Sequence, residues 1–256
     1  MGEIDKKVYF RGTFYTSLKD RIMSNPNLTS FLEKNHFVQG DKRLKFVRET
    51  ELGPLELWFQ PLKRTKYAGE IRYTEFVGCR VTLSMKLNVP SRFMVGDSNA
   101  IDNRLANFVN KKRGRELIKL KDPGNHLSAW VASRTWSENI LDDTEVKDAL
   151  AALFHTNEKS RRQQSLTLDP LQLTYSYRMG QVDLEALDAL IPPYLVVAKK
   201  VKEAREPEEK LSLTSTENYV LKHPYRVAIF VILGLMLLLV VPFIIIGLFM
   251  FMFASK

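Results

Sequence analysis

The chain has 256 residues, and its 38 Lys and Arg against 29 Asp and Glu give a formal net charge of +9. This excess favours anionic partners, namely phospholipid headgroups, nucleic acid or acidic proteins. Cys79 is the only cysteine, which excludes an intrachain disulfide and predicts a small buried side chain in a strand.

The first predicted elements are a short helix and a series of strands. "NPNLTSFLEKN" near the start is typical of a short helix. Alternation of apolar and polar residues then predicts strands within residues 43–47, 55–59, 70–77 and 80–89. Such one-sided alternation is typical of antiparallel strands with one solvated face.

The segment "VGDSNAIDNR" places Asp97 and Asp102 on either side of a turn rich in Ser and Asn. Clustered carboxylates and amides could hold a divalent cation, although the spacing is not that of an EF-hand loop. We prefer the interpretation that Asp97 or Ser98 caps a helix within residues 98–112.

The run "NKKRGRELIKLK" contains four closely spaced basic residues, Lys111, Lys112, Arg113 and Arg115. A solvated loop is the interpretation that we prefer, and contact with anionic lipid is the functional alternative. Binding of nucleic acid is disfavoured because the run has no neighbouring aromatic residues on which bases could stack.

The second half of the domain predicts further strands and helices. Strand-like alternation recurs in residues 126–133 and 165–179, and helical spacing in residues 142–154 and 182–204. Pro192-Pro193 should break or kink the last helix. The three tryptophans, Trp58, Trp130 and Trp136, are expected in the core or on an edge strand.

The C-terminal part of the chain predicts a membrane segment. Residues 205–226 are a polar linker and juxtamembrane segment, and residues 227–254 contain no charged, amide or hydroxyl side chain. A bilayer core requires about 20 apolar residues, so a single transmembrane helix is expected there. Lys222 and Arg226 precede it, and the N-terminus lacks an apolar secretory signal, which together predict a cytoplasmic domain.

The predicted organisation is therefore an α+β domain rich in antiparallel sheet (residues 1–204), the linker and a transmembrane anchor. One domain is preferred over two subdomains that meet near Gly114–Asn125. The order of elements resembles a class of bacterial membrane-attached proteins of unknown function. The similar stretches begin at "TLSMKLNVPSRFMVGDSN" and end at "DLEALDALIPPYLVVAKKV". This resemblance implies a fold and a membrane location, but no site residues.

No motif in the sequence specifies a reaction. The P-loop, GxGxxG, GxSxG, HExxH and CxxC patterns are absent, and no cofactor is expected. We therefore favour a non-enzymatic module that binds protein or lipid, with membrane lipids contacting residues 227–254 and a protein partner left unidentified. The alternative is a membrane-tethered enzyme whose site converges only in three dimensions, with Asp97, Asp102, His126 and His155 as its candidate residues.

Overall fold

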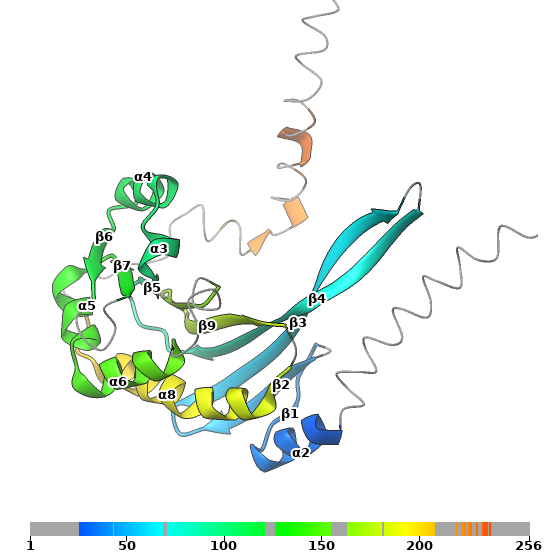
Figure 1. The fold of residues 1–256 in the computed structure, drawn as a ribbon. Coiled ribbons are helices and arrows are strands. Elements are labelled where there is room, and N and C mark those ends of the chain that lie inside the picture. Colours follow the sequence, from blue (N-terminus) through cyan, green and yellow to red (C-terminus); the bar gives the residue numbers. More distant parts are fainter. Residues whose placement is uncertain are drawn as a thin grey trace, which may run out of the picture. The chain divides into compact units, whose positions relative to one another are not determined.

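The computed structural model describes residues 26–207, except residues 43, 69–70, 121–125, 155–162 and 181, and isolated positions between 219 and 236. The chain forms two compact units, residues 1–211 and 212–256. The described part of the first unit contains the following elements (Figure 1): α2 (Pro26–Lys34), β1 (Val38–Gln39), β2 (Lys45–Thr50), β3 (Gly53–Ala68), β4 (Ile71–Lys86), β5 (Phe93–Asp97), α3 (Ser98–Ile101), α4 (Arg104–Lys112), β6 (Glu116–Lys119), β7 (Leu127–Val131), α5 (Arg134–Leu141), α6 (Thr144–Leu153), β8 (Ser165–Leu168), β9 (Gln172–Met179) and α8 (Leu184–Glu203).

The strands form one nine-stranded sheet in the order β1-β2-β3-β4-β9-β8-β5-β7-β6. All neighbouring strands are antiparallel. The long strands β3 and β4 form the central hairpin, and β9 pairs with β4 through Cys79–Lys86. The predicted α+β fold rich in antiparallel sheet is confirmed.

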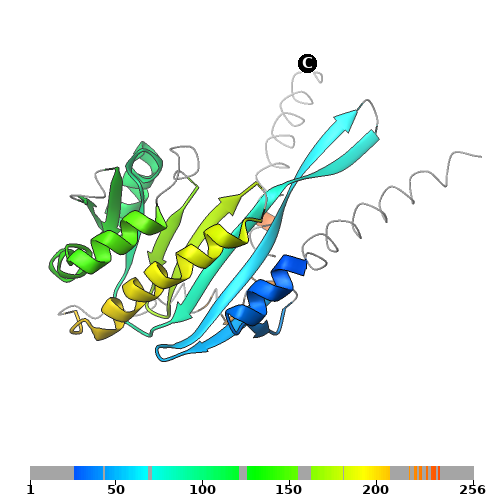
Figure 2. The ribbon, with the colours of Figure 1, turned by 60° about the horizontal axis from the view of Figure 1, so that its bottom comes forward.

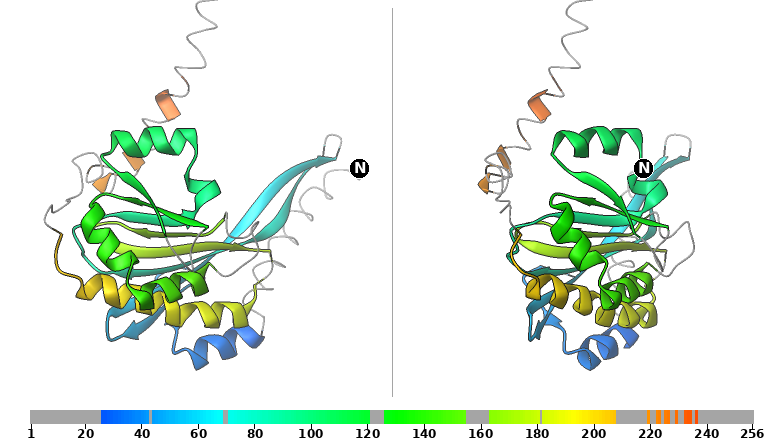
Figure 3. Two further views of the ribbon diagram at one scale, coloured as in Figure 1. Left: turned by 60° about the vertical axis from the view of Figure 1, so that its left-hand side comes forward. Right: turned by 90° about the vertical axis from the view of Figure 1, so that its left-hand side faces the viewer.

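Helices cover one face of the sheet. In Figures 2 and 3, α2, α6 and α8 lie side by side against the same face. Helix α3 lies on the opposite face at the other end of the sheet, where Trp130 Nε1 donates to Ile101 O at 3.1 Å. The sheet between α3 and the β3–β4 hairpin has no helix against that second face in the described part of the chain (Figure 1).

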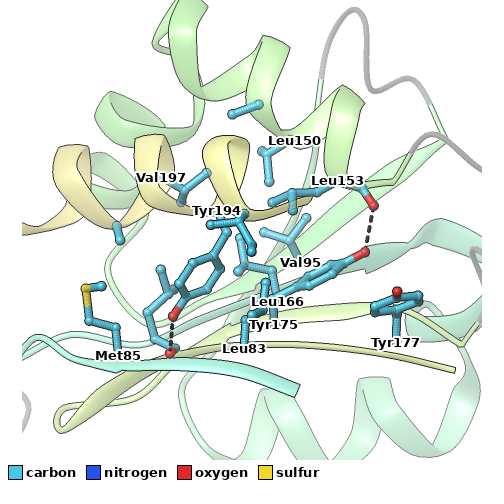
Figure 4. Packing of buried hydrophobic residues seen from close by; sticks show 14 of the residues in the cluster. Leu83, Met85, Val95, Leu150, Leu153, Leu166, Tyr175, Tyr177, Tyr194 and Val197 are labelled. Atoms are coloured by element: carbon cyan, nitrogen blue, oxygen red, sulfur yellow. Dashed lines mark hydrogen bonds between the residues drawn. The ribbon is translucent and has the colours of Figure 1, made fainter. Parts of the chain in front are cut away.

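Two buried tyrosines connect the helices to strand β9 (Figure 4). The hydroxyl of Tyr194 on α8 donates to Leu173 O at 2.8 Å, and the hydroxyl of Tyr175 on β9 donates to Leu153 O of α6 at 2.6 Å. Both side chains are fully buried, and burial raises their pKa values well above the usual value. Because an unpaired buried hydroxyl costs free energy, these two bonds favour one position of the helices on the sheet.

Of the two outcomes predicted for Pro192-Pro193, a break or a kink in the last helix, the break is wrong. Helix α8 runs from Leu184 to Glu203 with both prolines inside it. Its start is capped by Asp183, whose side chain accepts from Ala186 N at 3.0 Å. Buried residues lie on both sides of the prolines, and packing of this face against α6 and the sheet maintains the helix despite the lost backbone hydrogen bonds.

The single helix expected within residues 98–112 is two helices. α3 ends at Ile101, and Asn103 caps α4 by accepting from Ala106 N at 2.9 Å. Asp102 therefore lies at the C-cap of α3 rather than inside a helix. Strands β5 and β6 and helix α5 were not predicted. Trp136 lies on α5 and is buried in the core, one of the two positions expected for it.

The outer part of the central hairpin, residues 61–68 and 71–78, is a two-stranded ribbon beyond the reach of β2 and β9 (Figures 1 and 2). A register shift after Leu62 leaves one extra residue in β4 next to Gly78, as in a β-bulge. Along β3, alternate backbone N–H groups point towards β2, and Phe59 N is one of them because it donates to Leu44 O. Position 61 points to the same side, but β2 does not extend far enough to pair with it. Pro61 is therefore tolerated, because its missing N–H would have no strand partner.

Most of the apolar residues 227–254 lie outside the described residues, so the predicted transmembrane helix stays a prediction. Among the helices that the structure does describe, none is both long and apolar enough to cross a membrane. The described residues of this run, including Ile229, Ile232, Leu233 and Met236, are helical and expose more than half of their surface.

We predict that Gly78→Ala destabilises the domain by about 2 kcal/mol or more. Gly78 has φ +133°, and an added Cβ would lie in forbidden contact with Met179 O. Gly180→Ala is the matched control, because a Cβ there meets no atom within 4 Å. Urea unfolding of both variants measures the difference, and equal midpoints would contradict the close packing of β4 on the end of β9.

Candidate functional site: the open face of the sheet

The face of β3, β4, β8 and β9 that points away from α6 and α8 is termed the open face. Its side chains alternate with core residues such as Val81, Leu83 and Tyr175, which are buried under the helices. The open face consists of half-buried or exposed residues: Glu56, Trp58, Gln60, Arg80, Thr82, Ser84, Lys86, Ser165, Thr167, Gln172, Thr174, Ser176 and Arg178. The strand period of two thus gives a surface composed almost entirely of polar groups.

Strand register arranges these residues in rows across the sheet. One row joins Trp58, Thr82, Ser176 and Ser165 on four neighbouring strands. The next row joins Glu56, Ser84, Thr174 and Thr167 in the same way. The centre of the open face therefore carries a cluster of hydroxyl groups, each of which can donate and accept a hydrogen bond.

One hydroxyl of this cluster is buried without a hydrogen-bond partner among the described residues. Thr174 Oγ1 is inaccessible to solvent and makes no hydrogen bond with the part of the chain that the structure describes. Its neighbour in the row, Ser84, donates from Oγ to Glu56 Oε2 at 3.3 Å. Glu56 in turn pairs with Lys45 at 3.0 Å, so the acidic group of this face is already neutralised.

Arg80 and Arg178 lie directly opposite each other on β4 and β9 and are termed the arginine pair. Leu87 N donates to Leu171 O at the end of the same ladder. Because bonded and non-bonded pairs alternate in an antiparallel ladder, the arginine pair falls on a non-hydrogen-bonded position, where facing side chains are closest. Two like charges at such a position repel each other.

No acidic side chain of the described residues lies within salt-bridge distance of either arginine, nor of Lys86 at the other end of the open face. Gln60 completes the row of the arginine pair on β3. This row is the last on the open face before the ribbon leaves the sheet, since β9 ends at Met179, which faces the core. The pair therefore consists of two neighbouring arginines whose side chains are exposed to solvent.

Two lysines on the helix-covered side of the domain, in contrast, have acidic partners. Lys200 contacts both Asp143 and Glu145 at 3.0 Å, and Lys34 contacts Asp188 at 2.7 Å. The hydrogen bond with Glu145 is the main cause of the raised pKa of Lys200. The hydrogen bond with Lys34 likewise lowers the pKa of Asp188. The arginine pair and Lys86 differ from these two lysines in having no such partner among the described residues.

The predicted basic run lies at the end of α4 and in the turn after it. Lys111 and Arg113 are exposed, and Lys112 is the last residue of α4. Arg115 donates from Nη1 to Asn110 Oδ1 at 3.2 Å, so this guanidinium is partly engaged within the protein. In Figures 1 and 3, α4 and the ribbon both stand on the side of the sheet away from α6 and α8, which places this run on the same side as the arginine pair.

The side chains of Asp97 and Asp102, the predicted polar cluster, do not form a common site. Asp97 is buried and caps α3, accepting from Asn99 N at 3.0 Å. Asp102 is exposed and accepts from Asn107 Nδ2 at 2.9 Å. No group of three or more His, Cys, Asp or Glu that could hold a metal occurs among the described residues.

One cluster near Asp97 was not found from the sequence. Ser98 Oγ and Ser128 Oγ lie 2.7 Å apart, and Ser98 N donates to His126 O at 2.8 Å. His126 is therefore brought to the same end of the sheet as Asp97, whereas His155 lies outside the described residues. Only the pairing of β5 with β7 reveals this, because the two strands are separated by α3, α4 and β6.

Outside the open face, the described residues include one buried cysteine and line two hollows in the surface. Cys79 is buried, and burial raises the pKa of its thiol to about 11, so the thiolate is scarce at neutral pH. The hollows have volumes of about 270 and 310 Å³ and lie on either side of α5. They are lined by Trp136, Asn139, Asp143, Lys200 and Arg205 in one case and by Leu117, Lys119, Arg134, Glu138 and Asp142 in the other.

No protein-family model matches the chain, and no curated protein matches it. Among solved structures, the fold is similar to the crystal structure of the mycobacterial trehalose monomycolate transport factor A, TtfA. The TM-score is 0.43 and the sequence identity 7%, over 71% of this chain and 96% of that chain. At this level the likeness carries no conclusion about what this chain binds.

We predict that Arg80→Gln raises the melting temperature by about 1–2 °C at low ionic strength, because it relieves repulsion with Arg178. The gain should disappear at about 0.5 M salt, where exposed charges are screened. Lys86→Gln removes the same charge opposite the uncharged Gln172 and should give no such gain. Calorimetry without phosphate or sulfate measures all three proteins, and equal shifts for both variants would contradict the arginine pairing.

Proposed function

We propose that the chain is a non-enzymatic binding module, attached to a membrane by residues 227–254, that contacts anionic lipid headgroups with its open face and basic projections. The observation that carries the proposal is the concentration of unpaired positive charge at Arg80, Arg178 and Lys86. Each basic residue near an anionic surface contributes about 1 kcal/mol.

Lipid is preferred to nucleic acid and to protein for two reasons. First, the apolar residues 227–254 are long enough to span a bilayer, and the described ones among them expose apolar surface that lipid would cover. Second, the aromatic side chain of the open face, Trp58, is half-buried, and its ring is covered by Lys42 Nζ at 5.7 Å. Stacking of unpaired bases requires a free ring.

The proposed location is a single-pass membrane protein with residues 1–204 in the cytoplasm. Lys222 and Arg226 on the domain side of the apolar run support this orientation, because basic residues are enriched on the cytoplasmic side of a span. Residues 205–226 supply the polar connection between the domain and the bilayer.

A membrane-tethered enzyme is the second candidate, and one observation favours it. Ser98 Oγ and Ser128 Oγ lie 2.7 Å apart beside the buried Asp97, and the His126 carbonyl accepts a hydrogen bond from Ser98 N. Ser, His and Asp are residue types found in nucleophilic catalysis. The carboxylate of Asp97 already accepts a hydrogen bond from the α3 backbone. An enzyme site there gives no reason for contact between lipid and Lys63, Lys86 or Lys111, so protection of these lysines by anionic vesicles separates the two candidates.

We predict that the full chain stays with membranes after extraction with alkaline carbonate, because residues 227–254 span the bilayer. Deletion of residues 227–254 should release the protein into the supernatant. Deletion of the polar residues 205–218 is the matched control and should leave the protein in the membrane pellet. Release of the full chain would contradict a spanning segment.

A second prediction concerns the surface that faces lipid. The full chain, reconstituted in vesicles, is acetylated on lysine and analysed by mass spectrometry. In vesicles with about 30% phosphatidylserine, Lys63, Lys86 and Lys111 should be protected at least about threefold relative to pure phosphatidylcholine, since anionic headgroups attract them.

Lysines of the helix-covered side, Lys147 and Lys199, are the internal control and should be modified equally in both kinds of vesicle. Equal modification of Lys63, Lys86 and Lys111 in both kinds of vesicle would refute the lipid contact. Protection of the control lysines as well would indicate aggregation rather than a defined lipid-facing surface.

A further inference from the structure

The arginine pair has a geometry that calls for a specific ligand rather than a diffuse charged surface. Arg80 and Arg178 come from two neighbouring strands at positions where facing side chains are closest. Both are exposed, and neither has an acidic partner among the described residues. Two such guanidinium groups can bind one oxyanion, each through two parallel N–H donors.

The surroundings of the pair supply neutral hydrogen-bonding groups and no competing acid. Gln60 lies beside Arg80 in the same row, and the adjacent row contributes the hydroxyls of Thr82 and Ser176. The acid of the open face, Glu56, is two rows away and bound to Lys45, and Glu75 on the ribbon part of β4 is bound to Lys66. A tetrahedral anion with several oxygens could therefore use both arginines and still find donors in the next row.

Backbone rigidity favours binding at this position. The pair lies one row inside the end of the three-stranded part of the sheet, where Pro61, Cys79 and Met179 are still aligned, and the adjacent residues Val81 and Tyr177 are buried in the core. The repulsion between two fixed cations is then relieved when a dianion binds between them. Two arginines on a mobile loop would instead move apart and so relieve their repulsion without a ligand.

We propose that Arg80 and Arg178 form a binding site for a phosphate monoester group, with Gln60, Thr82 and Ser176 as secondary donors. This inference deepens the proposed function, because it names the headgroup chemistry that the open face recognises. A phosphate monoester at neutral pH carries close to two negative charges and three acceptor oxygens. It matches two guanidinium groups better than a singly charged diester does.

The test uses the full chain in a non-ionic detergent and measures its melting temperature against inorganic phosphate, at constant ionic strength set with chloride. The wild type should show a saturable rise. Arg80→Gln and Arg178→Gln should each weaken the apparent affinity by about tenfold or more, as expected for the loss of a charge-assisted pair of hydrogen bonds.

Two further variants guard against trivial outcomes. Arg80→Lys keeps the positive charge but loses the guanidinium group that can donate two parallel hydrogen bonds, so this variant should bind phosphate more weakly than the wild type. Lys199→Gln removes one exposed positive charge from the helix-covered side and should bind as the wild type does. If Lys199→Gln weakens phosphate binding as much as Arg80→Gln, the effect is general electrostatics and the inference is overturned.

The source of the phosphate is decided by a second titration with short-chain phosphatidic acid, short-chain phosphatidylcholine and a single-stranded oligonucleotide. Tighter, arginine-dependent binding of phosphatidic acid than of inorganic phosphate supports a lipid headgroup as the ligand. Binding of inorganic phosphate alone supports the site but removes the headgroup. Arginine-dependent binding of the oligonucleotide above that of either phosphate would overturn the membrane-lipid assignment.

Failure of the inference and failure of the proposed function are distinguishable. If no anion changes the melting temperature, or if the change persists in the Arg80→Gln/Arg178→Gln double variant, the phosphate site does not exist. The lysine footprint on vesicles tests general contact with anionic lipid independently, because it does not require a defined site.

Discussion

The structure depends on the burial of one face of the antiparallel sheet under α6 and α8. The hydroxyls of Tyr175 and Tyr194, both without access to solvent, bind backbone oxygens across this interface and so orient the helices on the sheet. Because side chains alternate strictly along a strand, fixing which residues of β4 and β9 face the helices also fixes which residues face away. The composition of the open face thus follows from the packing of the core.

This constraint explains why the arginine pair is retained despite its repulsion. A shift of β9 by one residue would separate Arg178 from Arg80, but it would also turn Tyr175 out of the core. The cost of two facing cations on an exposed row is small compared with the loss of a buried aromatic side chain. The sheet therefore tolerates the pair without any ligand, and a bound anion would change an unfavourable contact into a favourable one.

Much of this arrangement was predictable, and the part that was not has a physical reason. Alternation in residues 80–89 and 165–179 correctly indicated that Arg80 and Arg178 share a face with hydroxyl residues. It did not indicate that they are opposite each other, because pairing register depends on turns and on contacts between distant strands. The pairing of β5 with β7, which brings His126 towards Asp97, was hidden for the same reason.

Local signals also failed where packing decided the outcome. The two prolines were expected to interrupt the last helix, yet the buried residues on either side of them maintain α8 as one element. Conversely, Asn103 ended the helix expected within residues 98–112, because its side chain caps α4 at a point where no core contact opposes a break. β6 has four residues and a mixed burial pattern, too short for alternation to identify.

The bulge beside Gly78 lies two residues before Arg80 and so adjoins the proposed site. Gly78 permits β4 to approach the end of β9 closely, and beyond it the hairpin continues as a ribbon without further partners. The arginine pair lies immediately inside this junction, so one side of it faces the rigid sheet and the other faces the ribbon, where Arg64 is exposed and Lys66 pairs with Glu75. A ligand held by the pair would reach Arg64 only if the ligand were larger than a single phosphate. The junction thus favours a phosphate group on an extended anionic surface, where the fixed pair binds one headgroup and the ribbon can contact its neighbours.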